Sequence, residues 1–145
     1  MATVKDILET KGNEVWTATP DLSVRKALDL MAEKNVGALV VVDKDQILGI
    51  FSERDYARRV IEEDEFSLDT PVKRLMSSPI YFVTLQQSVD ECMALMTRKR
   101  FRHLPVIEGG KLVGLVSIGD VVKHALSEKE KTIKDLEDYI WIHMI

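Results

Sequence analysis

The sequence predicts an α+β fold made of two copies of one unit, each with the order strand, helix, strand, strand, helix. Three observations predict it: the chain matches itself when shifted by 65 positions, each copy carries an apolar stripe at helical spacing, and each carries two apolar runs joined by a polar turn. Between residues 19–58 and 84–123, 11 of 40 ungapped positions are identical along the printed sequence. The identical pairs include Gly49 and Gly114, Ser52 and Ser117, and Asp55 and Asp120.

The first helix of each copy is predicted by apolar residues at the i, i+3, i+4, i+7 spacing of one buried face. These helices start at Ser23 and Ser88, and Glu91 follows Ser88 by three residues, as in a capping box. Cys92 takes the place of Ala27, which indicates a small core residue rather than a catalytic thiol. The two stripes are Val24, Ala27, Leu28 and Met31, and Val89, Cys92, Met93 and Met96.

A β-hairpin is predicted after each of these helices. Apolar runs at residues 38–42 and 47–51, and again at 104–107 and 112–116, are separated by four-residue polar turns. Each hairpin leads directly into another helix, which begins at Ser52 or Ser117.

The two copies are expected to divide at an acidic run, residues 62–65, which is typical of a solvated connection. This gives domains at 1–65 and 66–126, followed by an extension at 127–145. Apolar residues at helical spacing predict that the extension is a helix, which packs either on its own domain or on a second subunit. They are Ile133, Leu136, Ile140 and Met144, within an apolar end that runs from Tyr139 to Ile145.

Composition limits the class of protein. The 145 residues are 46% hydrophobic and 30% charged, with a net charge of −4, which is typical of a densely packed domain. One cysteine excludes an internal disulfide framework, and no His/Cys spacing indicates a metal site. No apolar run or basic leader predicts a membrane span or a signal peptide, so a cytoplasmic protein is expected.

The positive charge is concentrated in one place. Arg98, Lys99, Arg100 and Arg102 lie within five positions, so the rest of the chain carries 16 − 24 = −8. This distribution suits a small anionic ligand better than a nucleic acid.

These repeated motifs resemble a tandem pair of CBS domains, the repeat named after cystathionine β-synthase, whose pairs are called Bateman modules. The resemblance implies two repeats packed about a pseudo-twofold axis, with two clefts that bind adenosine-containing ligands such as AMP, ADP, ATP, NAD or S-adenosylmethionine. It also implies a stand-alone regulatory module that forms homodimers and performs no catalysis. The motifs are residues 19–24, 36–43 and 48–55 in the first copy, and 102–107 and 113–120 in the second.

The Ser-x-x-Asp motif at Ser52/Asp55 and at Ser117/Asp120 has two readings. It can be a helix N-cap with an acidic residue that favours the helix dipole. It can also be a ligand site, because a helix N-terminus attracts phosphate and a carboxylate accepts hydrogen bonds from ribose hydroxyls. The resemblance favours the ligand reading, since the family's aspartate at this position holds the ribose.

The resemblance also pairs the aspartate of one copy with the early threonine of the other. Thr19 would join Ser117 and Asp120 at one cleft, and Thr84 would join Ser52 and Asp55 at the other. Leu85 follows Thr84 where the family has proline, which leaves the second cleft less well matched. Gly37 and Ala38, with the segment 15–17, are candidates for an apolar adenine slot, although core and turn positions explain them equally.

Three basic residues are further candidates. Arg102 and His103 enter a strand where matching family positions meet phosphate, which arginine can hold with two hydrogen bonds. Arg54 could contact phosphate at the other cleft or form a surface ion pair with the acidic connection. Arg98 and Lys99 are explained by a solvated helix end, where cations are favourable.

The expected function is therefore a regulatory sensor of an adenine nucleotide, AMP, ATP or NAD, with no required metal. The alternative is a structural or partner-binding dimerisation module without a ligand. No nucleophile, paired general base or metal set indicates an enzyme. A homodimer and an unidentified protein target are expected as partners, without nucleic acid or membrane.

Overall fold

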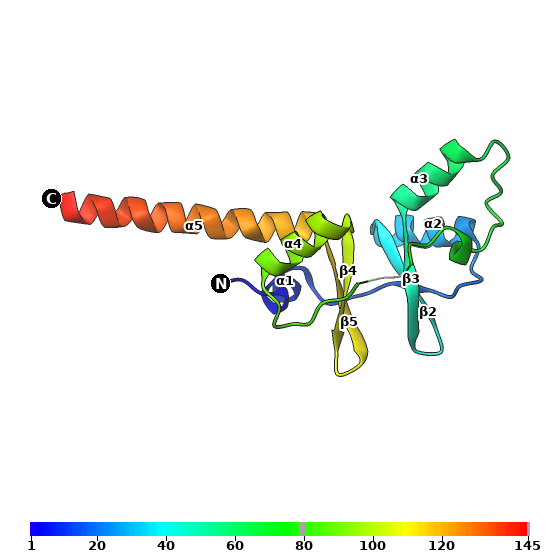
Figure 1. The fold of residues 1–145 in the computed structure, drawn as a ribbon, viewed down its shortest axis with the longest axis horizontal. Helices are drawn as coiled ribbons and strands as arrows, with labels where there is room; N and C mark the ends of the chain where they lie inside the picture. Colours follow the sequence, from blue (N-terminus) through cyan, green and yellow to red (C-terminus); the bar gives the residue numbers. More distant parts are fainter. Residues whose placement is uncertain (79–80, 145) are drawn as a thin grey trace. The chain divides into compact units, whose positions relative to one another are not determined.

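The computed structural model describes residues 1–78 and 81–144 (Figure 1). The chain divides into two compact units, each described by itself below. Residues Glu14–Tyr81 form the first-repeat unit, and Met1–Asn13 with Phe82–Ile145 form the second-repeat unit. These limits differ from the expected division after residue 65, because residues 1–13 pack with the second repeat and residues 66–76 pack with the first.

In the first-repeat unit, β1 lies parallel to β2, and β2 lies antiparallel to β3 in one sheet. Helix α2 packs its apolar stripe on this sheet, and the core gathers around Val24, Met31, Leu39 and Phe51. The elements are β1 (Thr17–Ala18), α2 (Val24–Lys34), β2 (Ala38–Asp43), β3 (Gln46–Ser52), α3 (Glu53–Glu62) and the 3-10 helix η1 (Val72–Arg74).

The second-repeat unit has the same order of helix, hairpin and helix. Its first strand is reduced to a single parallel bridge between Val83 and Val106, the counterpart of the β1–β2 pairing at Ala18 and Val41. Its core gathers around Ile7, Val89, Leu104 and Val116. The elements are α1 (Val4–Lys11), α4 (Val89–Lys99), β4 (His103–Glu108), β5 (Lys111–Ser117) and α5 (Ile118–Met144).

The predicted N-caps of the first helices are confirmed. The Ser23 and Ser88 side chains accept hydrogen bonds from the backbone N–H groups of Lys26 and Glu91, at 3.2 Å and 3.0 Å. The capping box expected at Ser88 is only half formed. The Glu91 carboxylate accepts from the side chain of Gln87 at 3.5 Å instead of from the backbone of the cap.

Both hairpins turn more tightly than the four residues expected from the sequence. The strands continue to Asp43 and restart at Gln46, so that only Lys44 and Asp45 lie between them, and both have positive φ. The second hairpin turns on Gly109 and Gly110, also at positive φ. Two-residue turns of this kind match the twist of paired strands, and glycine adopts them without steric cost.

The segment that precedes each repeat packs on the other repeat. Ile7 and Leu8 of α1 belong to the core of the second repeat, whereas Val72 and Leu75 of the η1 segment belong to the core of the first. The two segments have related sequences, Val4-Lys5-Asp6-Ile7-Leu8 and Val72-Lys73-Arg74-Leu75-Met76. This exchange explains why the compact units do not follow the order of the repeats along the chain.

The predicted C-terminal helix is confirmed, and it is continuous with the last helix of the second repeat. Helix α5 begins directly after Ser117 and runs for 27 residues. Every residue from Lys129 to Ile142 is exposed, so within the described chain this part of α5 does not pack on its own domain. Among the described residues, no helix is both long and apolar enough to cross a membrane.

Candidate functional site

The first candidate position is the start of α3, where Ser52 and Asp55 form a reciprocal capping box. The Ser52 backbone N–H and hydroxyl both donate to Oδ2 of Asp55 at 2.9 Å, and the Asp55 N–H donates back to Ser52 Oγ at 3.2 Å. The other carboxylate oxygen, Oδ1, accepts from the Ser77 hydroxyl at 3.2 Å. The capping reading of this motif is therefore confirmed, and the carboxylate is held in one orientation.

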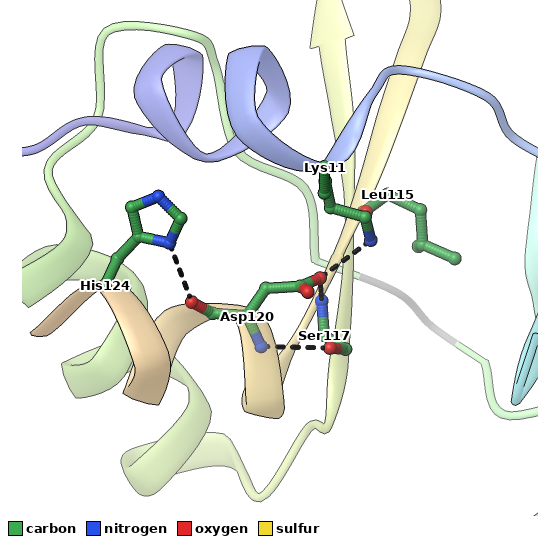
Figure 2. Close-up of polar contacts among 5 residues, drawn as sticks. All are labelled: Lys11, Leu115, Ser117, Asp120 and His124. Atoms are coloured by element: carbon green, nitrogen blue, oxygen red, sulfur yellow. Dashed lines mark hydrogen bonds and ion pairs between the residues drawn. The ribbon is translucent and has the colours of Figure 1, made fainter. Parts of the chain in front are cut away.

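The second candidate position, at the start of α5, has the same reciprocal serine–aspartate hydrogen bonds (Figure 2). We call each of these pairs, Ser52/Asp55 and Ser117/Asp120, a Ser–Asp frame. The Ser117 N–H donates to Oδ2 of Asp120 at 2.8 Å, and the Asp120 N–H donates to Ser117 Oγ at 3.2 Å. Lys11, at the end of α1, donates from Nζ to the same Oδ2 at 2.7 Å and to the Leu115 carbonyl at 2.9 Å. His124 Nδ1 lies 3.2 Å from the Asp120 carbonyl one turn later.

Lys11 and Ser77 make equivalent hydrogen bonds in the two units: each donates to a strand carbonyl and to the aspartate at the start of the following helix. Ser77 donates from its backbone N–H to the Ile50 carbonyl at 2.8 Å and from its hydroxyl to Asp55. Lys11 reaches the counterparts of both acceptors, Leu115 and Asp120, with its single ammonium group. The two otherwise matched carboxylates therefore differ in charge environment: one faces a neutral hydroxyl and the other faces a cation.

The surroundings of Asp120 set its charge state. Burial raises the pKa of its carboxyl group, but the hydrogen bond and charge of Lys11 and the N–H of Ser117 outweigh burial and hold the pKa below its usual value. Both side chains of the ion pair remain partly exposed, 35% for Lys11 and 24% for Asp120. The pair is thus open to exchange with a ligand or with solvent.

The hairpin brings the other candidates of each copy to the same end as the Ser–Asp frame. Ala38 lies opposite Ser52 in the β2–β3 pairing, and His103 lies opposite Ser117 in β4–β5. The residues just before them, Gly37 and Arg102, accept the first N–H of the following helix through their carbonyls, at 3.1 Å and 2.8 Å. Arg102 and Gly37 are exposed, whereas Ala38 is buried.

The remaining candidates are Arg54, Thr19 and Thr84. Arg54 is exposed on the first turn of α3, beside Asp55 in sequence. Thr19 is exposed directly after β1, and the half-buried Thr84 donates its N–H to the Gln87 side chain at 2.9 Å. Thr19 belongs to the first-repeat unit and Thr84 to the second, so their expected pairing with the aspartate of the other copy stays a prediction.

Other sequence features have structural explanations. Burial raises the pKa of the Cys92 thiol to about 11, as suits a core residue. Helix α4 ends at Lys99, and Arg100 follows it in the left-handed conformation, so Arg98 and Lys99 form an exposed helix end as expected. Within residues 1–78 and 81–144, no group of His, Cys, Asp and Glu side chains could hold a metal ion.

Lys11 and Ser77 donate hydrogen bonds to the candidate residues Asp120 and Asp55, and the repeat alignment does not reveal them. They lie in the segments that precede the two repeats, residues 4–11 and 72–77, which we call the leading segments. These segments match at an offset of 68 positions, as Val4 with Val72 and Lys5 with Lys73 show. The offset of 65 that aligns the rest of the repeats hides this relation. The signal for these segments in the sequence is their match at the second offset, 68.

Comparison with known proteins agrees with this architecture. A family model described as CBS domain matches residues 3–62 and again residues 72–127. The chain belongs to the CBS-domain family and contains two CBS repeats followed by a helix. The expected α+β fold class is thereby confirmed.

Individual relatives cover most of the chain. The CBS domain-containing protein CBSX3, mitochondrial, of Arabidopsis thaliana is 37% identical over 148 residues, which span 95% of this chain and 71% of that protein. The structure of a putative signal-transduction protein with CBS domains from Burkholderia ambifaria is 50% identical, with a TM-score of 0.80 over 87% of this chain and 95% of the other. The structure of CBSX2 in complex with AMP is 28% identical, with a TM-score of 0.66 over 89% of this chain and 99% of the other.

Proposed function

We propose that this protein is a regulatory sensor that binds an adenine nucleotide, AMP, ATP or NAD, at two sites and catalyses no reaction. The main observation behind this proposal is that the Ser–Asp frame occurs in both units. In each, an oriented aspartate lies at the start of the helix that follows the hairpin. The AMP complex of the related CBSX2 supports an adenosine-containing ligand. No metal is required for this binding.

Each part of the nucleotide meets suitable chemistry in the proposal. A ribose offers two hydroxyl donors, which a carboxylate accepts well, so Asp55 and Asp120 would bind the riboses. Phosphate suits guanidinium and imidazolium groups and the free N–H groups of a helix start. The proposed phosphate ligands are Arg102, His103 and Ser117 at one site and Ser52 and Arg54 at the other, with Thr19 and Thr84 beside the aspartate of the opposite copy, and Gly37 and Ala38 beside the adenine.

The two sites would not behave alike. A ribose that uses Oδ2 of Asp120 competes with the Lys11 ammonium, which already donates to that oxygen. At Asp55, a ribose that uses Oδ1 competes, among the described residues, with the neutral hydroxyl of Ser77. Exposed ion pairs are worth about 0.2–1 kcal/mol, so this competition corresponds to a modest difference in affinity between the sites.

A sensor that catalyses no reaction itself acts through partners. We therefore include in the proposal a homodimer and a separate protein target that responds to nucleotide occupancy. A module that only dimerises is the second candidate, and the exposed apolar side chains along α5 favour it, because they offer a contact that needs no ligand.

Isothermal titration calorimetry with AMP, ATP and NAD tests the proposal. We expect the wild-type chain to bind at least one of them, with two sites that Asp55→Asn and Asp120→Asn remove one at a time. Asp29→Asn is the matched control, because Asp29 is an exposed aspartate on α2 that belongs to neither Ser–Asp pair. Nucleotide at a hundred times its dissociation constant should also stabilise the fold by about 2.7 kcal/mol.

The double variant Asp55→Asn, Asp120→Asn should bind no nucleotide and still unfold cooperatively, since asparagine keeps an acceptor for the cap. If none of the three nucleotides gives heat or thermal stabilisation with the wild-type chain, the sensor proposal is wrong.

A further inference from the structure

The later turns of α5 are an exposed helix with no support from the rest of their unit. The helix is anchored only at its start, where Val121 is fully buried and Ala125 is 7% exposed. Figure 1 shows the remaining turns extending beyond α1 and α4 of the same unit. Glu128, which accepts a hydrogen bond from the backbone N–H of Ala2, is the last partly buried residue in the part of the helix whose side chains are described, up to Ile142.

These turns carry a regular apolar stripe. Leu126, Ile133, Leu136 and Ile140 are 54–57% exposed and are spaced by seven, three and four residues. This is the a and d spacing of a coiled coil, with Leu126, Ile133 and Ile140 at a positions and Leu136 at a d position. Val122, 40% exposed, continues the stripe toward the anchored end, and Lys129 is the one polar residue within it.

The charges on the polar side of this helix indicate what kind of partner could cover the apolar stripe. Residues 127–142 contain three lysines and five acidic residues, a net charge of 3 − 5 = −2. A helix that lies on an anionic membrane or on nucleic acid needs an excess of basic residues on this side. Glu130 and Lys134, four residues apart, instead have the spacing of ion pairs that stabilise a solvated helix.

The charges are also divided along the helix, which bears on the orientation of a partner. Residues 128–134 carry +1, from three lysines and two glutamates, and residues 135–138 carry −3. An antiparallel second copy sets each lysine-bearing segment against the acidic segment of the other helix. A parallel copy would set acid against acid and Lys129 against its own equivalent.

We propose that the α5 stripe packs antiparallel against the α5 stripe of a second copy of this chain, centred between Ile133 and Leu136. This extends the homodimer named under the proposed function by assigning its contact surface, and it needs no nucleotide. In this arrangement Ile133 of one copy packs on Leu136 of the other. The two Leu126 side chains lie at opposite ends, about 25 Å apart along the helix axis at 1.5 Å per residue.

Sedimentation equilibrium of the full-length chain without nucleotide tests the contact. The wild-type chain should be a dimer, and Ile133→Glu should raise its dissociation constant by about a hundredfold or more, because it sets a carboxylate against the apolar Leu136 of the other copy at both equivalent contacts. Ile142→Glu is the matched control: it is the same change at another exposed isoleucine of α5, outside the stripe. It should leave the dimer intact. A monomeric wild-type chain, a dimer that survives Ile133→Glu, or equal weakening by both variants would overturn the proposal.

Disulfide cross-linking tests the orientation, with little background because the native Cys92 is buried. A mixture of Ile133→Cys and Leu136→Cys chains should form a mixed disulfide dimer, whereas Leu126→Cys chains should not cross-link to each other. Efficient cross-linking at Leu126→Cys would show a parallel pair and contradict the proposal. Nucleotide calorimetry on the Ile133→Glu variant separates the two proposals, since intact binding by a monomer would leave the sensor function standing.

Discussion

At the scale of single residues, the two Ser–Asp frames show how a local motif and a distant contact combine. Each cap closes over three residues, so the chain has to bring nothing else together for Asp55 or Asp120 to be oriented. The contact from Lys11 to Asp120, in contrast, spans 109 positions. The sequence alone could predict the caps for this reason, and it could not predict the cation beside one of them.

Replacing Lys11 tests its effect on the neighbouring carboxylate. We expect Lys11→Met to raise the pKa of Asp120, because burial then acts with less opposition. The lowered pKa in the wild-type fold means that ionised Asp120 stabilises the protein above the usual aspartate pKa, and that this contribution is lost as pH falls through the folded-state pKa. Lys11→Met should therefore lose less stability than wild type as the pH falls below about 4, the usual aspartate pKa.

Carboxyl NMR titration of Asp120 and thermal unfolding at several pH values measure both effects. Lys5→Met is a suitable control, since Lys5 is an exposed lysine on the same helix. An Asp120 pKa that does not change in Lys11→Met would show that the ion pair does not form in solution.

At the scale of elements, the hairpins depend on one glycine in each copy. Gly49 and Gly114 occupy matched places, and each is crossed by the leading segment that packs on its repeat. A β-carbon at Gly49 would lie 2.6 Å from the Ser77 carbonyl oxygen and 2.9 Å from the Met76 sulfur. At Gly114 it would lie 2.6 Å from a terminal carbon of Leu8. The obstacle is backbone in the first case and the end of a flexible side chain in the second.

We therefore expect Gly49→Ala to destabilise the protein by about 2–3 kcal/mol and Gly114→Ala by about 1 kcal/mol. Urea unfolding measures the difference. Gly37→Ala is the control, because a β-carbon there meets nothing within 4 Å, and its effect should stay within about 0.5 kcal/mol. Equal losses for Gly49→Ala and Gly114→Ala would contradict this account of the two crossings.

Most elements were predictable from periodicity, and the exceptions have physical reasons. The helices α2 and α4 and both hairpins follow the expected patterns, because one buried face sets their spacing. The first strand of the second repeat shortens to the Val83–Val106 bridge, although the sequence predicts a strand in both copies. Helix α1 was not predicted, because its apolar face is set by packing on a repeat that lies more than 70 residues away in the sequence.

At the scale of the whole molecule, the exchange of leading segments determines which substitutions affect which unit. Ile7 lies before the first repeat but is buried in the core of the second, and Leu75 lies before the second repeat but is buried in the core of the first. The repeat of 65 residues was evident from the sequence. The exchange was not, because packing partners at this distance leave no mark in the periodicity of either segment.

Ile7→Ala and Leu75→Ala are a matched pair that tests the exchange. Each should cost about 2–5 kcal/mol, as truncation of a buried aliphatic side chain does. In hydrogen exchange, Ile7→Ala should reduce protection in β4 and β5, and Leu75→Ala should reduce it in β2 and β3. Loss of protection in the repeat that directly follows the mutated segment, with the other repeat unchanged, would contradict the exchange.

The division into units also fixes the order in which the protein can form as it leaves the ribosome. The first-repeat unit is continuous in sequence and has all its parts once residue 81 has emerged. The second-repeat unit is discontinuous, so α1 emerges first yet has no core to join until β4 and β5 follow. At about 5–20 residues per second, helix α1 waits several seconds with Ile7 and Leu8 uncovered. Within this unit, helix α1 is therefore the segment exposed longest to chaperones and to misassembly between neighbouring chains.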